Sequence, residues 1–269
     1  MQNKLFKPIL SLHYLSVDVA FGAFVNSYFI NKIFDIQYNL ELSFCLFCSV
    51  LIIYWFDHYL DTLNKGFNVI DERHEFVLKH KTKLAFASVL LSIFVCVIIY
   101  SVGVIKLIKV ILISTISLFS YFLLANKRII SKEFMVSSIY ALGITGLALL
   151  QNINQFVLLF YIMIFLVTVQ NMLMINIKEW SIDKQNNSSN LRWVFSEIFI
   201  MRVSFFLFFS TLLLFGILFI YKPENTMILY GFCLVLNGLV QQVLTHTQIK
   251  YYRVIGEAAY CIPVILFLL

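Results

Sequence analysis

The sequence contains few charged residues, few prolines and few glycines. Charged residues are 13% of the 269 residues, and there are only three prolines and nine glycines. A soluble domain carries about twice that charged fraction. One core of this size could not bury the apolar residues, which form 61% of the chain. The same composition excludes a disordered chain and a fibrous repeat rich in proline or glycine.

Two binding patterns are also missing. The lysines and arginines form no basic stripe long enough to bind nucleic acid. The cysteines lack the second pair of cysteines or histidines that a zinc site needs, so we expect them to be buried as small apolar residues. They are Cys45, Cys48, Cys96, Cys233 and Cys261.

Long apolar segments fill most of the chain. A helix needs about 20 apolar residues to cross a bilayer, and no cleavage site of small residues follows the first segment, so we expect it to be a membrane helix. The composition predicts an all-α polytopic transmembrane bundle of about nine helices, forming a single domain over residues 1–269. The expected spans are residues 9–30, 40–60, 84–102, 104–124, 134–151, 156–176, 196–220, 226–246 and 253–269.

Lysine and arginine are distributed unevenly over the connections between these spans. With a cytoplasmic N-terminus, the segments on that side carry fifteen of these residues and the opposite loops carry four. Cytoplasmic loops are enriched in lysine and arginine, so the distribution indicates an integral multi-pass membrane protein with a cytoplasmic N-terminus. Two long polar connections, residues 61–83 and 177–195, are then expected to be cytoplasmic.

Two related acidic patterns stand at the cytoplasmic ends of the second and sixth expected spans. Residues 54–61 read Y-x-x-D-x-x-x-D and residues 176–183 read N-x-x-E-x-x-x-D, an offset of 122 residues. Acids four residues apart share one face of a helix, and like charges this close repel unless a cation lies between them. Mg²⁺ accepts such oxygen ligands and completes its shell with water and phosphate. The expected ligands are Asp57, Asp61, Asn176, Glu179 and Asp183; the alternative is that these charged helix ends only face water.

Basic side chains follow the second and fourth expected spans on the same side of the membrane. A phosphate ester bound with Mg²⁺ needs such cations, with arginine as a bidentate donor. The expected diphosphate-binding residues are Arg73, His74, Lys127 and Arg128. Because cytoplasmic loops are basic in any case, an orientation signal without a binding role is the alternative.

Several polar groups lie inside the expected spans, where ionisable residues are candidates for function. Asp18, Tyr54 and Asn171 are weak candidates for an acceptor pocket, and interhelical hydrogen bonding is the alternative. His13 and Asp18 are five residues apart, which is a poor spacing for a direct pair on one helix. The other polar groups at membrane depth are Gln170, Arg202, Gln241, Gln242, His246 and Glu257.

The chain resembles the UbiA-type intramembrane prenyltransferases. Members have nine transmembrane helices around a central cavity, with N-D-x-x-D-x-x-x-D after the second helix and a pattern close to D-x-x-D-x-x-x-D after the sixth. The acids of residues 54–61 match the last two of the first motif, whereas Ile53 and Tyr54 replace its leading Asn-Asp. Residues 176–183 match the second motif with conservative changes. The stretch YFLLANKRIISKEFMVSSIYALGITG, residues 121–146, is similar to the family's loop 4–5 and fifth helix, and Arg73 occupies the place of its loop 2–3 arginine.

The resemblance implies Mg²⁺-dependent transfer of a prenyl group from an allylic prenyl diphosphate to an acceptor within the membrane. The acceptor, an aromatic or other lipid-soluble nucleophile, stays open, as does the prenyl length. The resemblance implies catalytic roles for Asp57, Asp61, Glu179 and Asp183, with membrane lipids as the surroundings. Two alternative functions remain. One is a secondary transporter. The other is a catalytically inactive membrane scaffold on the same fold, which is suggested by Tyr54 in place of the first motif's aspartate.

Overall fold

The structure is a computed structural model that describes residues 6–64, 72–102, 131–151, 154–186, 190–221 and 224–268. These residues form helices and connections without any strand, which confirms the all-α prediction for this part of the chain. The first half contains α1 (Phe6–Tyr14), α2 (Val17–Ile33), α3 (Asn39–Asn64), α4 (Glu72–Lys79), α5 (Lys81–Ser101) and α7 (Ser131–Gln151). The second half contains α8 (Gln155–Lys178), α9 (Trp180–Gln185), η1 (Leu191–Trp193), α10 (Glu197–Tyr221), α11 (Asn225–His246), α12 (Tyr252–Ala258) and η2 (Ala259–Phe267).

Six of the described helices are long and apolar enough to cross a membrane: α3, α5, α7, α8, α10 and α11. This supports an integral multi-pass membrane protein. The expected span over residues 104–124 lies outside the described residues, so the count of nine helices stays a prediction.

The first expected span, residues 9–30, is not one helix, and this prediction was wrong. The chain breaks between α1 and α2 at Ser16, whose φ of 57° is left-handed. A break leaves carbonyl groups without helical partners, and these must be satisfied inside a membrane protein. The Trp55 indole donates to the carbonyl of Leu15 (2.9 Å), and Arg73 donates to the carbonyl of His13 (3.1 Å). Tertiary donors therefore stabilise a break for which the sequence offers neither proline nor glycine.

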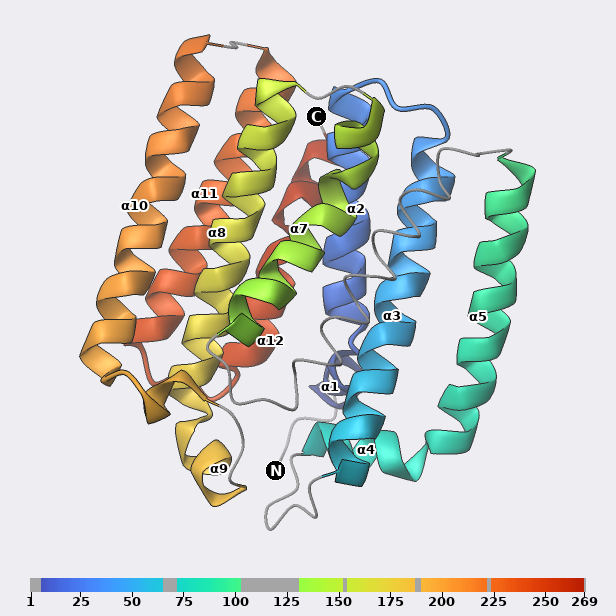
Figure 1. Ribbon diagram of the computed structural model, residues 1–269, viewed down its shortest axis with the longest axis vertical. Coiled ribbons are helices and arrows are strands. Elements are labelled where there is room, and N and C mark those ends of the chain that lie inside the picture. Colours follow the sequence, from blue (N-terminus) through green and yellow to red (C-terminus); the bar gives the residue numbers. More distant parts are fainter. Residues whose placement is uncertain are drawn as a thin grey trace.

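The last expected span, residues 253–269, also differs from a regular α-helix. The α-helix α12 ends at Ala258, and the chain continues as the 3₁₀ helix η2, which contains Pro263. Proline has no N–H to donate and disfavours the α conformation of the residue before it. Figure 1 shows this segment behind α7 and α8, with α2 beside it.

The helices form a bundle whose centre lies among α2, α7, α8 and α11 (Figure 1). In the described part of the chain, α10 packs on α8 and α11, whereas α5 packs mainly on α3 and α4. The burial predicted for the cysteines is confirmed for Cys45, Cys48 and Cys233. It is wrong for Cys96, which is exposed because α5 lies at the edge of the bundle.

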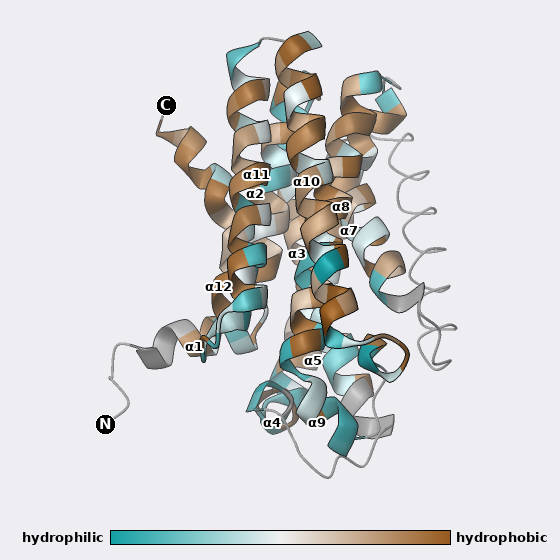
Figure 2. Ribbon diagram, turned by 90° about the vertical axis from the view of Figure 1, so that its left-hand side faces the viewer, coloured by the Kyte–Doolittle hydropathy of each residue, from teal (hydrophilic) through white to brown (hydrophobic). Residues whose placement is uncertain are grey.

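One end of the bundle is polar, and we call the end that carries α1, α4 and α9 the polar end. Figure 2 shows that α4 and α9 are hydrophilic, while the long helices above them are largely hydrophobic. The lower ends of α3 and α8 reach the same end in Figure 1. The two acidic patterns therefore lie at the same end of the bundle, as the alternation of spans predicts.

A close contact joins α2 to the C-terminal segment in the apolar part of the bundle. A Cβ placed on Gly22 would lie 2.6 Å from the Cβ of Tyr260. One turn later, the Asn26 amide donates to the carbonyls of Gly22 (2.7 Å) and Tyr260 (2.8 Å) and accepts from the Tyr230 hydroxyl (2.8 Å). Glycine at position 22 thus allows η2 to approach closely enough for these hydrogen bonds.

Gly22→Ala is expected to destabilise the protein by about 1–3 kcal/mol, because the added methyl group would overlap the Cβ of Tyr260, which cannot move unless its backbone moves. The matched control is Gly146→Ala in α7, where no atom lies within 4 Å of an added Cβ; there we expect no loss, since alanine favours a helix over glycine. The measurement is the thermal unfolding midpoint in detergent. Equal midpoints for the two variants would contradict the close contact.

Candidate functional site

Both acidic patterns lie at the polar end, but their local structures differ. Asp57 lies within α3, which continues to Asn64, and its side chain is half-buried. Glu179, by contrast, is the residue at which the chain bends between α8 and α9, with φ −93° and ψ 3°. Glu179 and Asp183 therefore do not share one continuous helix, although the Asp183 N–H still donates to the Glu179 carbonyl (2.9 Å).

Asn176 and Asp183 hold the connection that follows α9. The Asn176 side-chain oxygen accepts from the backbone N–H of Leu191 (2.9 Å). The Asn190 amide donates to the Asn176 carbonyl (2.9 Å) and to Oδ2 of Asp183 (2.7 Å). These contacts give both predicted ligands a structural role, because they hold η1 against the end of α8.

Glu179 is joined to the C-terminal helix α12. Its Oε1 accepts from Nη1 of Arg253 (2.8 Å) and from the hydroxyl of Tyr252 (3.2 Å). Both side chains of this ion pair are about one fifth exposed. Among the described residues, Oε2 of Glu179 has no protein donor, so one oxygen of this carboxylate is available to a ligand.

Arg253 also starts a chain of charged contacts into the bundle. Its Nε donates to Oε1 of Glu257 (3.1 Å), one helical turn later, and Oε2 of Glu257 accepts from Nη2 of Arg73 (3.0 Å). Nδ1 of His13 lies 3.3 Å from Oε2 of Glu257 and 2.7 Å from Oδ2 of Asp18. We call this set the ion network: His13, Asp18, Arg73, Glu179, Arg253 and Glu257.

The centre of the ion network is buried. Arg73 is 2% exposed and Glu257 is 4% exposed. Burial of a charge is costly unless it is paired and hydrogen-bonded, and the carboxylate of Glu257 has a cationic donor on each oxygen. Arg73 is less completely paired: its Nε and Nη1 are buried and have no hydrogen-bond partner within the described ranges. Two donors of this buried guanidinium thus lack an acceptor among the described residues.

The first acidic pattern adjoins the ion network through Tyr54. Tyr54 and Asp57 lie three residues apart on α3, so they share one face of this helix. The charged groups of Glu257, Arg73 and Arg253 lie near the Tyr54 hydroxyl.

The side chains of His13, Asp18 and Glu257 could also ligate a metal ion. Their ligand atoms lie within 4.8 Å of one another. Both oxygens of Glu257, however, already accept from arginine. A divalent cation at this position would lie beside the guanidinium of Arg73, so the geometry favours the ion network over a metal centre.

The structure brings together several residues that the sequence predicted separately: Asp18, Tyr54, Arg73 and Glu179. Asn171 is buried between α8 and α12, where its Oδ1 would lie 3.2 Å from a Cβ on Gly256. The side chains of Asp61 and His74 lie outside the described residues, as do Lys127 and Arg128 entirely.

Sequence reasoning missed the pairing of His13 with Asp18 and the parts played by Tyr252 and Arg253. The pairing arises because the break at Ser16 folds α1 against α2, which a continuous helix with this spacing would not allow. Arg253 and Glu257 are four residues apart, and this spacing was a usable signal for a helical ion pair. Arg73 was predicted at the site, but its burial against Glu257 was not.

Comparisons with models of protein families, with curated proteins and with solved structures give no match for this chain. Its function therefore has to be inferred from the polar end itself.

Glu257→Gln is expected to lower the free energy of unfolding by about 3–5 kcal/mol, because it leaves the buried guanidinium of Arg73 without its counter-charge. The control is Glu197→Gln, which removes the partly exposed ion pair with Arg192 (2.9 Å) and is expected to cost at most about 1 kcal/mol. Chemical denaturation in detergent measures both. A loss no larger for Glu257→Gln than for the control would contradict the ion network.

Proposed function

We propose that this protein is a divergent member of the UbiA-type intramembrane prenyltransferases, which transfers a prenyl group from an allylic prenyl diphosphate to a lipid-soluble acceptor. One observation carries the proposal: acidic residues on α3 and at the end of α8 lie at the same end of the bundle as a buried, incompletely paired arginine. A diphosphate needs this combination of carboxylates for a bridging cation and of guanidinium groups for its own oxygens.

Mg²⁺ prefers oxygen ligands, and each of the five predicted side chains offers an oxygen atom. Asp57, Asp61, Asn176, Glu179 and Asp183 would hold it, with Oε2 of Glu179 as the oxygen without a protein donor among the described residues. When bound, Mg²⁺ supplies charge neutralisation of the diphosphate leaving group.

Arg73 has the role of a diphosphate donor in this proposal. Glu257 fixes one nitrogen of its guanidinium, and Nε and Nη1 remain as donors. A guanidinium held in place by a buried carboxylate loses little entropy when it binds an anion. Its fixed charge would stabilise the diphosphate as the C–O bond breaks, while the long apolar helices surround the prenyl chain.

A second candidate function, an inactive membrane scaffold, is favoured by the Glu179–Arg253 ion pair. Arg253 competes with a metal ion for the same carboxylate, and Tyr54 removes one acid from the first pattern. A scaffold would keep the ion network for stability and would neither bind Mg²⁺ nor release diphosphate. Measurements of Mg²⁺ binding and of diphosphate release therefore distinguish the two candidate functions.

Purified protein in lipid vesicles is expected to release diphosphate from radiolabelled farnesyl or geranylgeranyl diphosphate in the presence of Mg²⁺ and aromatic acceptors. Asp57→Asn and Glu179→Gln should each lower this rate by about 100-fold or more, because each removes a carboxylate that would hold the Mg²⁺ needed to neutralise the leaving group. The matched control is Glu41→Gln, which changes an exposed acid at the opposite end of α3.

Two outcomes would contradict the proposal in different ways. Turnover that survives both substitutions would place the site elsewhere in the protein. A wild-type protein that neither releases diphosphate nor binds Mg²⁺ by titration calorimetry would support the scaffold instead.

A further inference from the structure

A groove lies on the outer surface of the bundle, between α10 and the end of α11, away from the ion network. It has a volume of about 470 Å³ and is lined by Ile198, Met201, Arg202, Phe205 and His246. Three of these side chains are apolar and two carry nitrogen donors, so the groove combines a hydrophobic wall with hydrogen-bonding groups.

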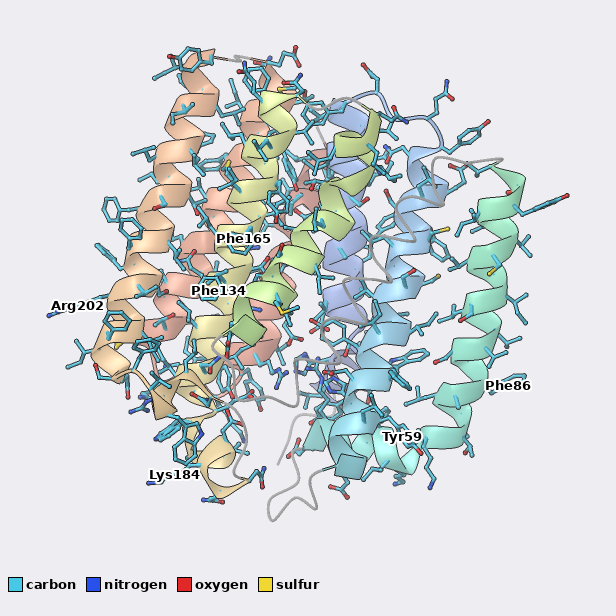
Figure 3. All side chains as sticks on the ribbon, viewed as in Figure 1. Tyr59, Phe86, Phe134, Phe165, Lys184 and Arg202 are labelled. Carbon is cyan, nitrogen blue, oxygen red and sulfur yellow. The ribbon has the colours of Figure 1, made fainter. Side chains whose placement is uncertain are left out.

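Arg202 is a cation on an apolar helix. It lies five residues after Glu197, or about 7.5 Å along the axis at 1.5 Å per residue, and its side chain points away from the bundle (Figure 3). Among the described residues it makes no hydrogen bond or ion pair, and the nearest acid along α10, Glu197, is paired with Arg192 (2.9 Å). An arginine this near the end of a membrane-spanning helix extends toward the headgroup region, where the phosphates of lipids lie.

A chain of hydrogen bonds fixes His246 beside Arg202. The Gln170 amide nitrogen must donate, because it faces the carbonyl of Ser204 (3.1 Å), and it also faces Oε1 of Gln242 (3.5 Å). Gln242 therefore presents its amide nitrogen to Nε2 of His246 (2.9 Å). Nε2 then accepts, and in the neutral imidazole the proton lies on Nδ1. The buried chain thus ends in a second donor at the groove.

The apolar surface continues from the groove along α10 toward the middle of the helix. Phe205 and Phe209 are each 51% exposed, and their ring centroids are 4.8 Å apart. Phe209 lies one turn farther from the polar end than Phe205, on the same face of the helix. A ligand held at Arg202 would therefore meet apolar surface on the side that leads into the span.

We propose that this groove binds an anionic phospholipid, with the phosphate held by Arg202 and His246 and an acyl chain lying along Phe205 and Phe209. Charge complementarity supports this occupant, since the groove offers two donors and no acid among its lining residues. Basic pockets between transmembrane helices bind anionic headgroups in this way. A soluble phosphate would leave the aromatic surface unused.

Native mass spectrometry of the detergent-purified protein tests this proposal with two lipids of identical acyl chains, phosphatidylglycerol and phosphatidylcholine. We expect the wild type to prefer phosphatidylglycerol and Arg202→Gln to bind it about tenfold more weakly, as the loss of a charge-assisted hydrogen bond predicts. The matched control is Lys184→Gln, which removes an exposed cation on α9 at the same end of the molecule, outside the groove (Figure 3).

Three results would overturn the proposal. The first is an equal loss of phosphatidylglycerol affinity in Arg202→Gln and Lys184→Gln, which would indicate general electrostatic attraction of the lipid to the basic protein surface. The second is displacement of phosphatidylglycerol by an equal concentration of glycerol phosphate, which would indicate a site for free phosphate. The third is a wild type without preference between the two lipids, and this result decides the matter even if Arg202→Gln does not fold.

Discussion

The buried carboxylate of Glu257 is the interaction on which the polar end depends. It accepts from arginines on two different elements, Arg73 on α4 and Arg253 on its own helix, and it lies beside His13 of α1. A charge removed from water is tolerated only when such partners surround it. The position of Glu257 therefore fixes the arrangement of three segments that the chain connects only through long intervening helices.

The same interaction explains why the two acidic patterns are not equivalent in structure. Arg253 pairs with Glu257 through Nε and with Glu179 through Nη1, so it links the second pattern directly to the buried centre. Asp57 is part of a regular helix and meets the network through the surroundings of Tyr54. The two acidic patterns thus share the spacing of their residues in the sequence but not their local structure, and each is in contact with different neighbours.

The sequence predicted the long apolar helices well, because hydrophobic length decides whether a segment crosses a membrane. It also predicted that both acidic patterns reach one end of the bundle, because strict alternation of spans requires it. The break at Ser16 was not predictable, since no glycine or proline marks it and its carbonyls are satisfied by Trp55 and Arg73 from distant segments. Contacts such as His13 with Asp18 follow from that break and were missed with it.

The contact between Arg73 and Glu257 joins residues that are 184 positions apart in the chain. At about 5–20 residues per second, a ribosome needs roughly 10–40 s to cover that distance. During this interval His13 and Arg73 have been synthesised but their common partner, Glu257, has not. The buried centre of the ion network can therefore form only after the final segment has been synthesised.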